Sequence, residues 1–118
     1  MYLHKEINSI EAMPQKAGKG VSMKMLLSPD ESPNFAMRNF IIEAGGHMPL
    51  HTNSVEHEQF VLSGRASVQI GDEIIEAKAG DILLIPAGVS HSYKTIGEES
   101  YSFLCLVPKG EDYITIIK

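Results

Sequence analysis

The chain has 118 residues, of which 43% are hydrophobic and 21% charged, and this size and composition predict one globular domain rather than a disordered chain. A net charge of −5 argues against nucleic acid and anionic membrane surfaces as partners, because both need a concentrated basic face. The single cysteine excludes an internal disulfide, and neither a signal peptide nor an apolar run near the ~20 residues of a membrane span is present. We therefore expect a cytoplasmic protein.

Short segments rich in Val, Ile, Phe and Leu alternate with turn signals along the chain. In order, they are residues 21–27, 35–43, 59–62, 66–70, 73–77, 82–85, 92–96 and 101–107. This spacing predicts an all-β sandwich or barrel. Gly71-Asp72 predicts a tight hairpin, and Gly45-Gly46 predicts a turn. Helix is expected only as a turn within residues 8–13.

Three of the five histidines are candidates for one shared site. His51 and His57 precede the turn at Gly64, and His91 follows much later, beyond Pro86-Ala87-Gly88. A β-barrel can bring such distant residues together on its inner face. Each histidine taken singly is better explained as a partly exposed or hydrogen-bonded core residue. Only their joint spacing indicates metal binding.

That spacing resembles a known family. Two glycine–histidine frames match the two cupin motifs in order, namely Gly45-x5-His51-x-Asn53-x3-His57-x6-Gly64 (residues 45–64) and Gly80-x5-Pro86-x-Gly88-x2-His91-x3-Thr95 (residues 80–95). The resemblance implies a single cupin domain over residues 1–118, folded as a double-stranded β-helix, or jelly-roll β-barrel, with little or no helix. Residues 32–38, 56–62 and 103–108 further resemble small stand-alone cupins whose site holds manganese with four histidines.

The resemblance implies a divalent metal ion bound by His51, His57 and His91. Asn53 stands where the family has another histidine, so it either binds weakly, binds through water, or leaves a three-histidine site. Thr95 replaces the final Asn of the second motif. Imidazole ligands suit Mn(II), Fe(II), Ni(II), Cu(II) or Zn(II), and the subgroup favours Mn(II) or Fe(II). Glu58 is not expected to bind, because it would face away from His57 in a strand.

The strand periodicity also predicts residues that line a substrate pocket around this site. They are Arg38, Met48, Gln59, Tyr93, Phe103 and Cys105. Gln59 is a candidate acceptor for the second ring nitrogen of His57. Cys105 is either an inert buried thiol or an oxidisable one, and Arg38 either binds an anion or pairs with a carboxylate.

Two functions follow from these residues. The first is a metal-dependent oxidoreductase, dioxygenase-like, that acts on a small organic molecule; an isomerase or lyase belongs to the same class. The second is a non-catalytic barrel that binds or senses a small ligand, which Asn53 in a ligand position favours. A homodimer is expected, with exposed strands at the N-terminus or at residues 113–117 pairing across the partner.

Overall fold

The protein is described by a computed structural model that covers residues 2–117. A 3₁₀ turn, η1 (Ile7–Ser9), precedes an almost entirely antiparallel β structure. The strands are β1 (Met13–Pro14), β2 (Lys19–Leu27), β3 (Phe35–Asn53), β4 (His57–Ser63), β5 (Arg65–Ile70), β6 (Glu73–Lys78), β7 (Ile82–Ile85), β8 (His91–Ile96), β9 (Tyr101–Pro108) and β10 (Ile114–Ile116). The predicted all-β class with minimal helix is therefore confirmed.

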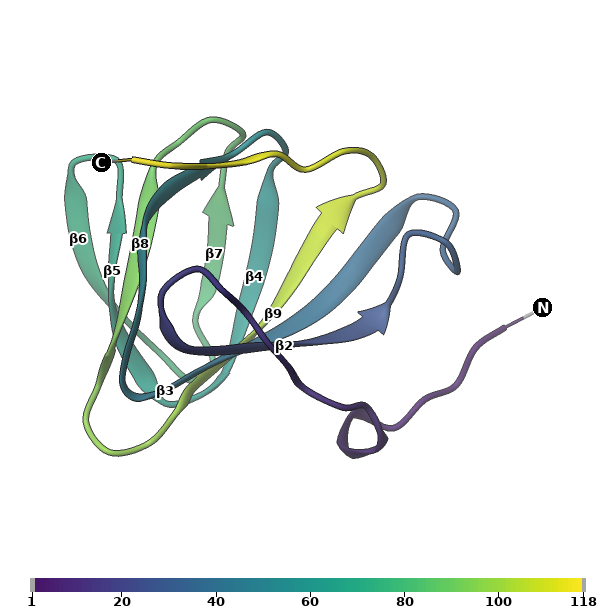
Figure 1. The fold of residues 1–118 in the computed structure, drawn as a ribbon, viewed down its shortest axis with the longest axis horizontal. Helices are drawn as coiled ribbons and strands as arrows, with labels where there is room; N and C mark the ends of the chain where they lie inside the picture. The colour runs from purple at the N-terminus through teal and green to yellow at the C-terminus, as the bar shows by residue number, and fades with distance from the viewer. Residues whose placement is uncertain (1, 118) are drawn as a thin grey trace.

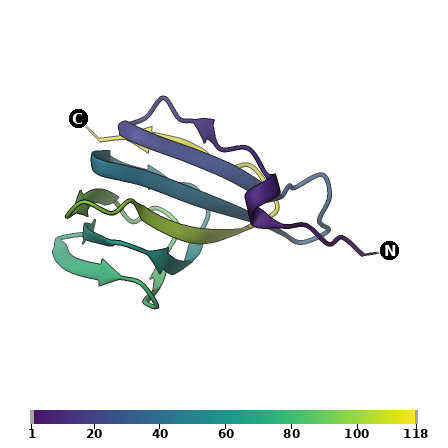
Figure 2. The same ribbon diagram turned by 90° about the horizontal axis from the view of Figure 1, so that it is seen from below.

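The strands form one curled sheet rather than a flat layer (Figure 1). Its order is β6-β5-β8-β3-β9-β4-β7, with β2 and β10 also paired to β3. The view in Figure 2 shows the strands lying one above another, with the N-terminal segment running beyond one end of them. Strands β8, β5 and β6 lie on one side and β9, β4 and β7 on the other, so their inner faces enclose the core.

Strand β3 connects the two sides, and it differs from the sequence prediction. A turn was predicted at Gly45-Gly46, but the strand runs through these glycines without ending. Val21 of β2 pairs with Ile42 of β3, and Lys19 pairs with His47. The register therefore advances two residues on β2 but five on β3, so the two glycines lie in a bulge of β3. Beyond the bulge, β3 pairs with β8 and β10 and carries His51.

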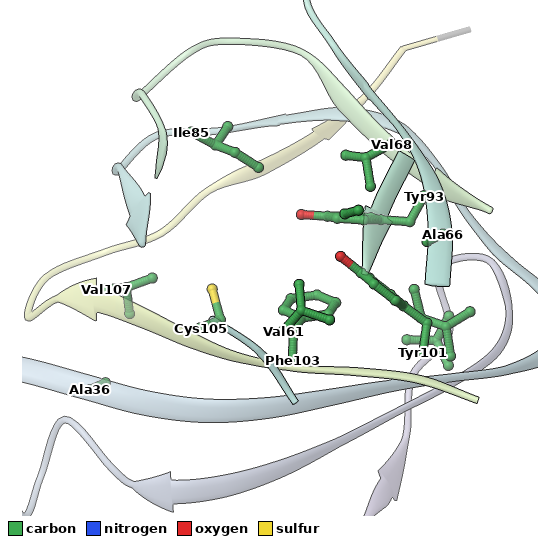
Figure 3. Close-up of a cluster of buried hydrophobic side chains, with 13 residues drawn as sticks. Ala36, Val61, Ala66, Val68, Ile85, Tyr93, Tyr101, Phe103, Cys105 and Val107 are labelled. Atoms are coloured by element: carbon green, nitrogen blue, oxygen red, sulfur yellow. The ribbon is translucent and has the colours of Figure 1, made fainter. Parts of the chain in front are cut away.

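Alternation along the strands separates the core from the surface. On β9, Tyr101, Phe103 and Cys105 are buried, and the residues between them are half-buried, as the period of two predicts. Figure 3 shows these side chains with Tyr93 pointing into the space between the two sides. The Phe103 ring stacks on Tyr93 at 5.2 Å between ring centroids. This aromatic layer forms the floor of the candidate site.

The Gly71-Asp72 hairpin is confirmed, since Ile70 pairs directly with Glu73. The expectation that residues 113–117 pair across a partner stays a prediction. Within the chain, strand β10 pairs with β3, with Ile114 opposite Asn53 and Ile116 opposite His51. The C-terminal segment is therefore part of the wall beside the candidate site.

Candidate functional site

A cavity of about 110 Å³ lies between the two sides of the curled sheet. It is lined by every residue that the sequence placed in the site, namely His51, His57, His91, Asn53, Arg38, Met48, Gln59, Tyr93, Phe103 and Cys105. The lining also includes Ile114 and Ile116 of β10, which the sequence analysis did not place there. The volume is of the same order as the ~150 Å³ that holds a benzene ring. The pocket therefore suits a small organic molecule.

His51 and His91 are opposite one another on β3 and β8, and their ring centroids are 4.2 Å apart. The Nδ1 atom of His51 lies 2.7 Å from the Pro49 carbonyl oxygen, and that of His91 lies 2.9 Å from the Val89 carbonyl oxygen. A carbonyl oxygen only accepts, so Nδ1 carries the proton in both rings. Nε2 is then the basic nitrogen of each ring, as a metal ligand requires.

His57 opens β4, and its ring centroid lies 6.0 Å from that of His91. Its Nδ1 lies 3.4 Å from Cys105 Sγ, and its Nε2 lies 3.1 Å from Asp112 Oδ2. The prediction that Gln59 accepts from His57 is wrong, because the His57 ring nitrogens contact Asp112 and Cys105, and Gln59 Oε1 has no hydrogen-bond partner among the described residues. The Gln59 side-chain nitrogen donates to the Tyr93 hydroxyl at 2.7 Å. Glu58 is exposed on the outer face, as predicted.

Asn53 is buried, with 4% of its surface exposed. Its side-chain nitrogen donates to Asp112 Oδ1 at 3.2 Å, whereas its Oδ1 has no hydrogen-bond partner among the described residues. Thr95 plays a structural part, since its hydroxyl donates to the Ile42 carbonyl oxygen at 3.1 Å. Asn53 therefore faces the pocket, whereas Thr95 does not line it.

Asp112 is the charged residue in contact with the site that the sequence analysis missed. It lies between β9 and β10, outside both motifs, and contacts residues more than fifty positions earlier in the chain. No local pattern marks such a contact. The only signal is its place immediately before residues 113–117. That apolar segment was expected to pack against other residues, and it would carry the preceding acid with it.

Burial keeps His57 and His91 uncharged. Desolvation lowers the pKa of His91 from its usual value to about 4. The pKa of His57 is also lowered, first by burial and then by the Arg38 guanidinium, against the opposing effect of Asp112. Both rings are therefore neutral near pH 7, which is the form that binds metal ions.

Arg38 brings a permanent positive charge to the pocket. One of its terminal nitrogens donates to Cys105 Sγ at 3.4 Å, and the other lies 4.0 Å from Asp112 Oδ2. Its guanidinium carbon stands 5.1 Å from the centre of the Phe40 ring. Burial raises the pKa of the Cys105 thiol despite Arg38, so Cys105 is present as a neutral thiol.

The donor atoms suit a divalent ion, but they are not gathered around one point. Within residues 2–117, no group of three or more His, Cys, Asp or Glu side chains has the arrangement of a ready-made metal centre. Two imidazoles with basic Nε2 atoms and the unpaired amide oxygen of Asn53 nevertheless face one small cavity. His57 would have to give up its hydrogen bond with Asp112 before its Nε2 atom could bind the same ion as His51 and His91.

A curled antiparallel sheet with histidines from three strands around an inner pocket defines the class of cupin-type barrels. The family model of the cupin domain, Cupin_2, matches residues 38–107, which is more than half of the chain. The chain belongs to this family. Membership of the all-histidine manganese subgroup stays a prediction.

Individual relatives carry different names. The polyketide cyclase RemF of Streptomyces resistomycificus superposes with a TM-score of 0.91 at 23% identity, covering 100% of this chain and 87% of that one. A predicted oxalate decarboxylase of Thermotoga maritima superposes with a TM-score of 0.80 at 22% sequence identity. The match covers 92% of this chain and 100% of that one. The 1-methylthio-D-xylulose 5-phosphate methylsulfurylase of Rhodospirillum rubrum is 28% identical over 76 residues, covering 64% of this chain and 49% of that protein.

These likenesses establish the fold and leave the reaction open. The chain spans only about half the length of the methylsulfurylase. No helix in the described part of the chain is long and apolar enough to cross a membrane.

Proposed function

We propose that this protein is a metal-dependent enzyme that acts on a small organic molecule, with a divalent ion held by His51, His57 and His91. One observation carries the proposal: the Nδ1 protons of His51 and His91 are both committed to backbone carbonyls. Such hydrogen bonds fix the ring orientation and the tautomer of histidines that bind metals. Mn(II) or Fe(II) is the favoured ion, and Ni(II), Cu(II) or Zn(II) are the alternatives.

A bound ion would supply Lewis acidity and open coordination positions, which dioxygenase-like oxidation and isomerase or lyase chemistry both require. The chain itself would supply the shape and polarity of the pocket. Phe103 and Met48 provide apolar walls, and Tyr93 presents a phenol whose pKa burial raises, so that it stays protonated. Tyr93 and Gln59 together offer a fixed hydrogen-bonding edge to a substrate. We favour oxidation because Mn(II) and Fe(II), the favoured ions, are redox-active.

The test is metal stoichiometry followed by turnover. Metal-free protein would be loaded anaerobically with Fe(II) or Mn(II), passed through gel filtration and assayed by elemental analysis. We expect one ion per chain, and oxygen uptake with small organic substrates. His51→Ala should lose the ion. His47→Ala is the matched control, because His47 is an exposed histidine on the same strand. Equal metal retention in both variants would refute the proposed ligand set.

A non-catalytic ligand-binding barrel is the second candidate. It is favoured by the Asp112 carboxylate, which contacts both His57 and Asn53. These two side chains therefore have hydrogen-bond partners without an ion. Native mass spectrometry separates the two functions. A metal-free protein that retains an organic ligand through purification would support the binding barrel and contradict the enzyme.

A further inference from the structure

The carboxylate of Asp112 enters the candidate metal site from the C-terminal segment. Its Oδ2 lies 3.1 Å from His57 Nε2, and its Oδ1 accepts from the Asn53 amide at 3.2 Å. The side chain is only 17% exposed. A carboxylate in this place contacts one of the two ring nitrogens through which His57 could bind an ion.

The segment that carries Asp112 is hydrogen-bonded to strand β3 and to the residue after it. Strand β10 pairs with β3 directly beside the site, with Ile116 opposite His51. The backbone nitrogen of Tyr113, next to Asp112, donates to Ser54 Oγ at 2.7 Å, and the Ser54 nitrogen donates to the Tyr113 carbonyl oxygen at 3.1 Å. Figure 1 shows this segment, in yellow, crossing above the strands at one end of the curled sheet. Asp112 is therefore held in position by the backbone on its C-terminal side.

We infer that Asp112 is a further protein ligand of the metal ion, supplied by the C-terminal segment in place of the imidazole that Asn53 lacks. This inference rests on the proposed metal site. Around an octahedral ion with bonds of about 2.1 Å, neighbouring donor atoms are about 3 Å apart. The separation between His57 Nε2 and Asp112 Oδ2 matches that spacing. A small inward shift would let one ion replace the hydrogen bond between them.

Charge supports the same assignment. Three neutral imidazoles leave the whole 2+ charge of an ion uncompensated in a buried pocket, and burying an unpaired charge is costly. The Asp112 carboxylate is the anionic side chain that contacts His57. Oxygen donors of this kind suit Mn(II), and a mixed His and carboxylate set suits Fe(II).

Asp112 could instead compete with the ion, and this role predicts the opposite change in metal affinity when the carboxylate is removed. If Asp112 only occupies the pocket as a hydrogen-bond partner of His57, an incoming ion must displace it. Removing the carboxylate would then strengthen metal binding. If Asp112 is a ligand, its removal weakens metal binding. The sign of the change in affinity therefore separates the two roles.

The experiment is isothermal titration of metal-free protein with Co(II), using Asp112→Asn as the variant. Asparagine keeps the shape of the side chain but removes its negative charge. We expect the affinity to fall at least about tenfold, and the Co(II) d–d absorption bands to change. Glu111→Gln is the matched control, because Glu111 is an exposed neighbouring acid whose carboxylate accepts a hydrogen bond from the Tyr113 hydroxyl. Its affinity should equal that of the natural chain.

Equal or tighter Co(II) binding by Asp112→Asn would overturn the inference while leaving the three-histidine site intact. If the natural chain binds no Co(II), the proposed function fails and this inference fails with it. Tyrosine fluorescence and circular dichroism establish that the variant is folded. Should Asp112→Asn unfold, Asp112→Ser is titrated in its place and read by the same criteria.

Discussion

Gly64, the last residue of the first motif, is predicted to contribute strongly to the stability of the fold. It stands in the turn between β4 and β5 with φ of +80°, and a Cβ there would lie 2.2 Å from the Ser100 carbonyl oxygen. Gly71 is the matched control, since its φ is +59° and no other described atom lies within 4 Å of a Cβ built on it. Gly64→Ala and Gly71→Ala therefore share the backbone strain but differ in the clash.

The left-handed conformation costs an alanine about 1–2 kcal/mol, partly offset by about 0.4–1 kcal/mol from restricting the unfolded chain. Gly71→Ala should therefore lose about 1 kcal/mol. Gly64→Ala must also displace backbone, and overpacking of this kind adds about 1–3 kcal/mol, for a total of about 3 kcal/mol. Urea unfolding followed by tyrosine fluorescence measures both, since the chain has no tryptophan. Equal losses in the two variants would refute the steric reasoning.

Two further predictions concern the thiol and the assembly. Cys105 is 1% exposed, so we expect it to react with a thiol reagent such as DTNB only after denaturation; fast labelling of the folded protein would contradict its burial. We also expect a homodimer, because Phe60 and Ile82 are paired neighbours on the outer face of β4 and β7, and both are exposed. Light scattering should give twice the 13.0 kDa mass of the chain, with Ile82→Lys shifting it toward monomer; a monomeric natural chain would contradict the expectation.

Much of the fold could be predicted because its signals are local. The apolar segments at residues 82–85 and 101–107 became β7 and β9 almost without change, and alternation correctly placed Phe103 and Cys105 inside. The motif spacing brought His51, His57 and His91 to one pocket. These features depend on period and turn chemistry, which a single sequence displays.

The remaining features depend on pairing between distant residues. Gly45-Gly46 looks like a turn locally, but β2 pairs on both sides of it and turns it into a bulge. Asp112 carries no motif, and its position follows from β10 docking on β3. The predicted contact between Gln59 and His57 failed because Asp112 and Cys105, both distant in sequence, contact the two ring nitrogens of His57.

Elemental analysis of the protein purified without added metal tests the central claim most directly. Our account predicts about one equivalent of manganese or iron per chain, lost on His91→Ala and retained on His47→Ala. A natural chain free of metal that also fails to take up Mn(II), Fe(II) or Co(II) in titration would contradict it. The three histidines would then be ordinary hydrogen-bonded residues of a barrel core.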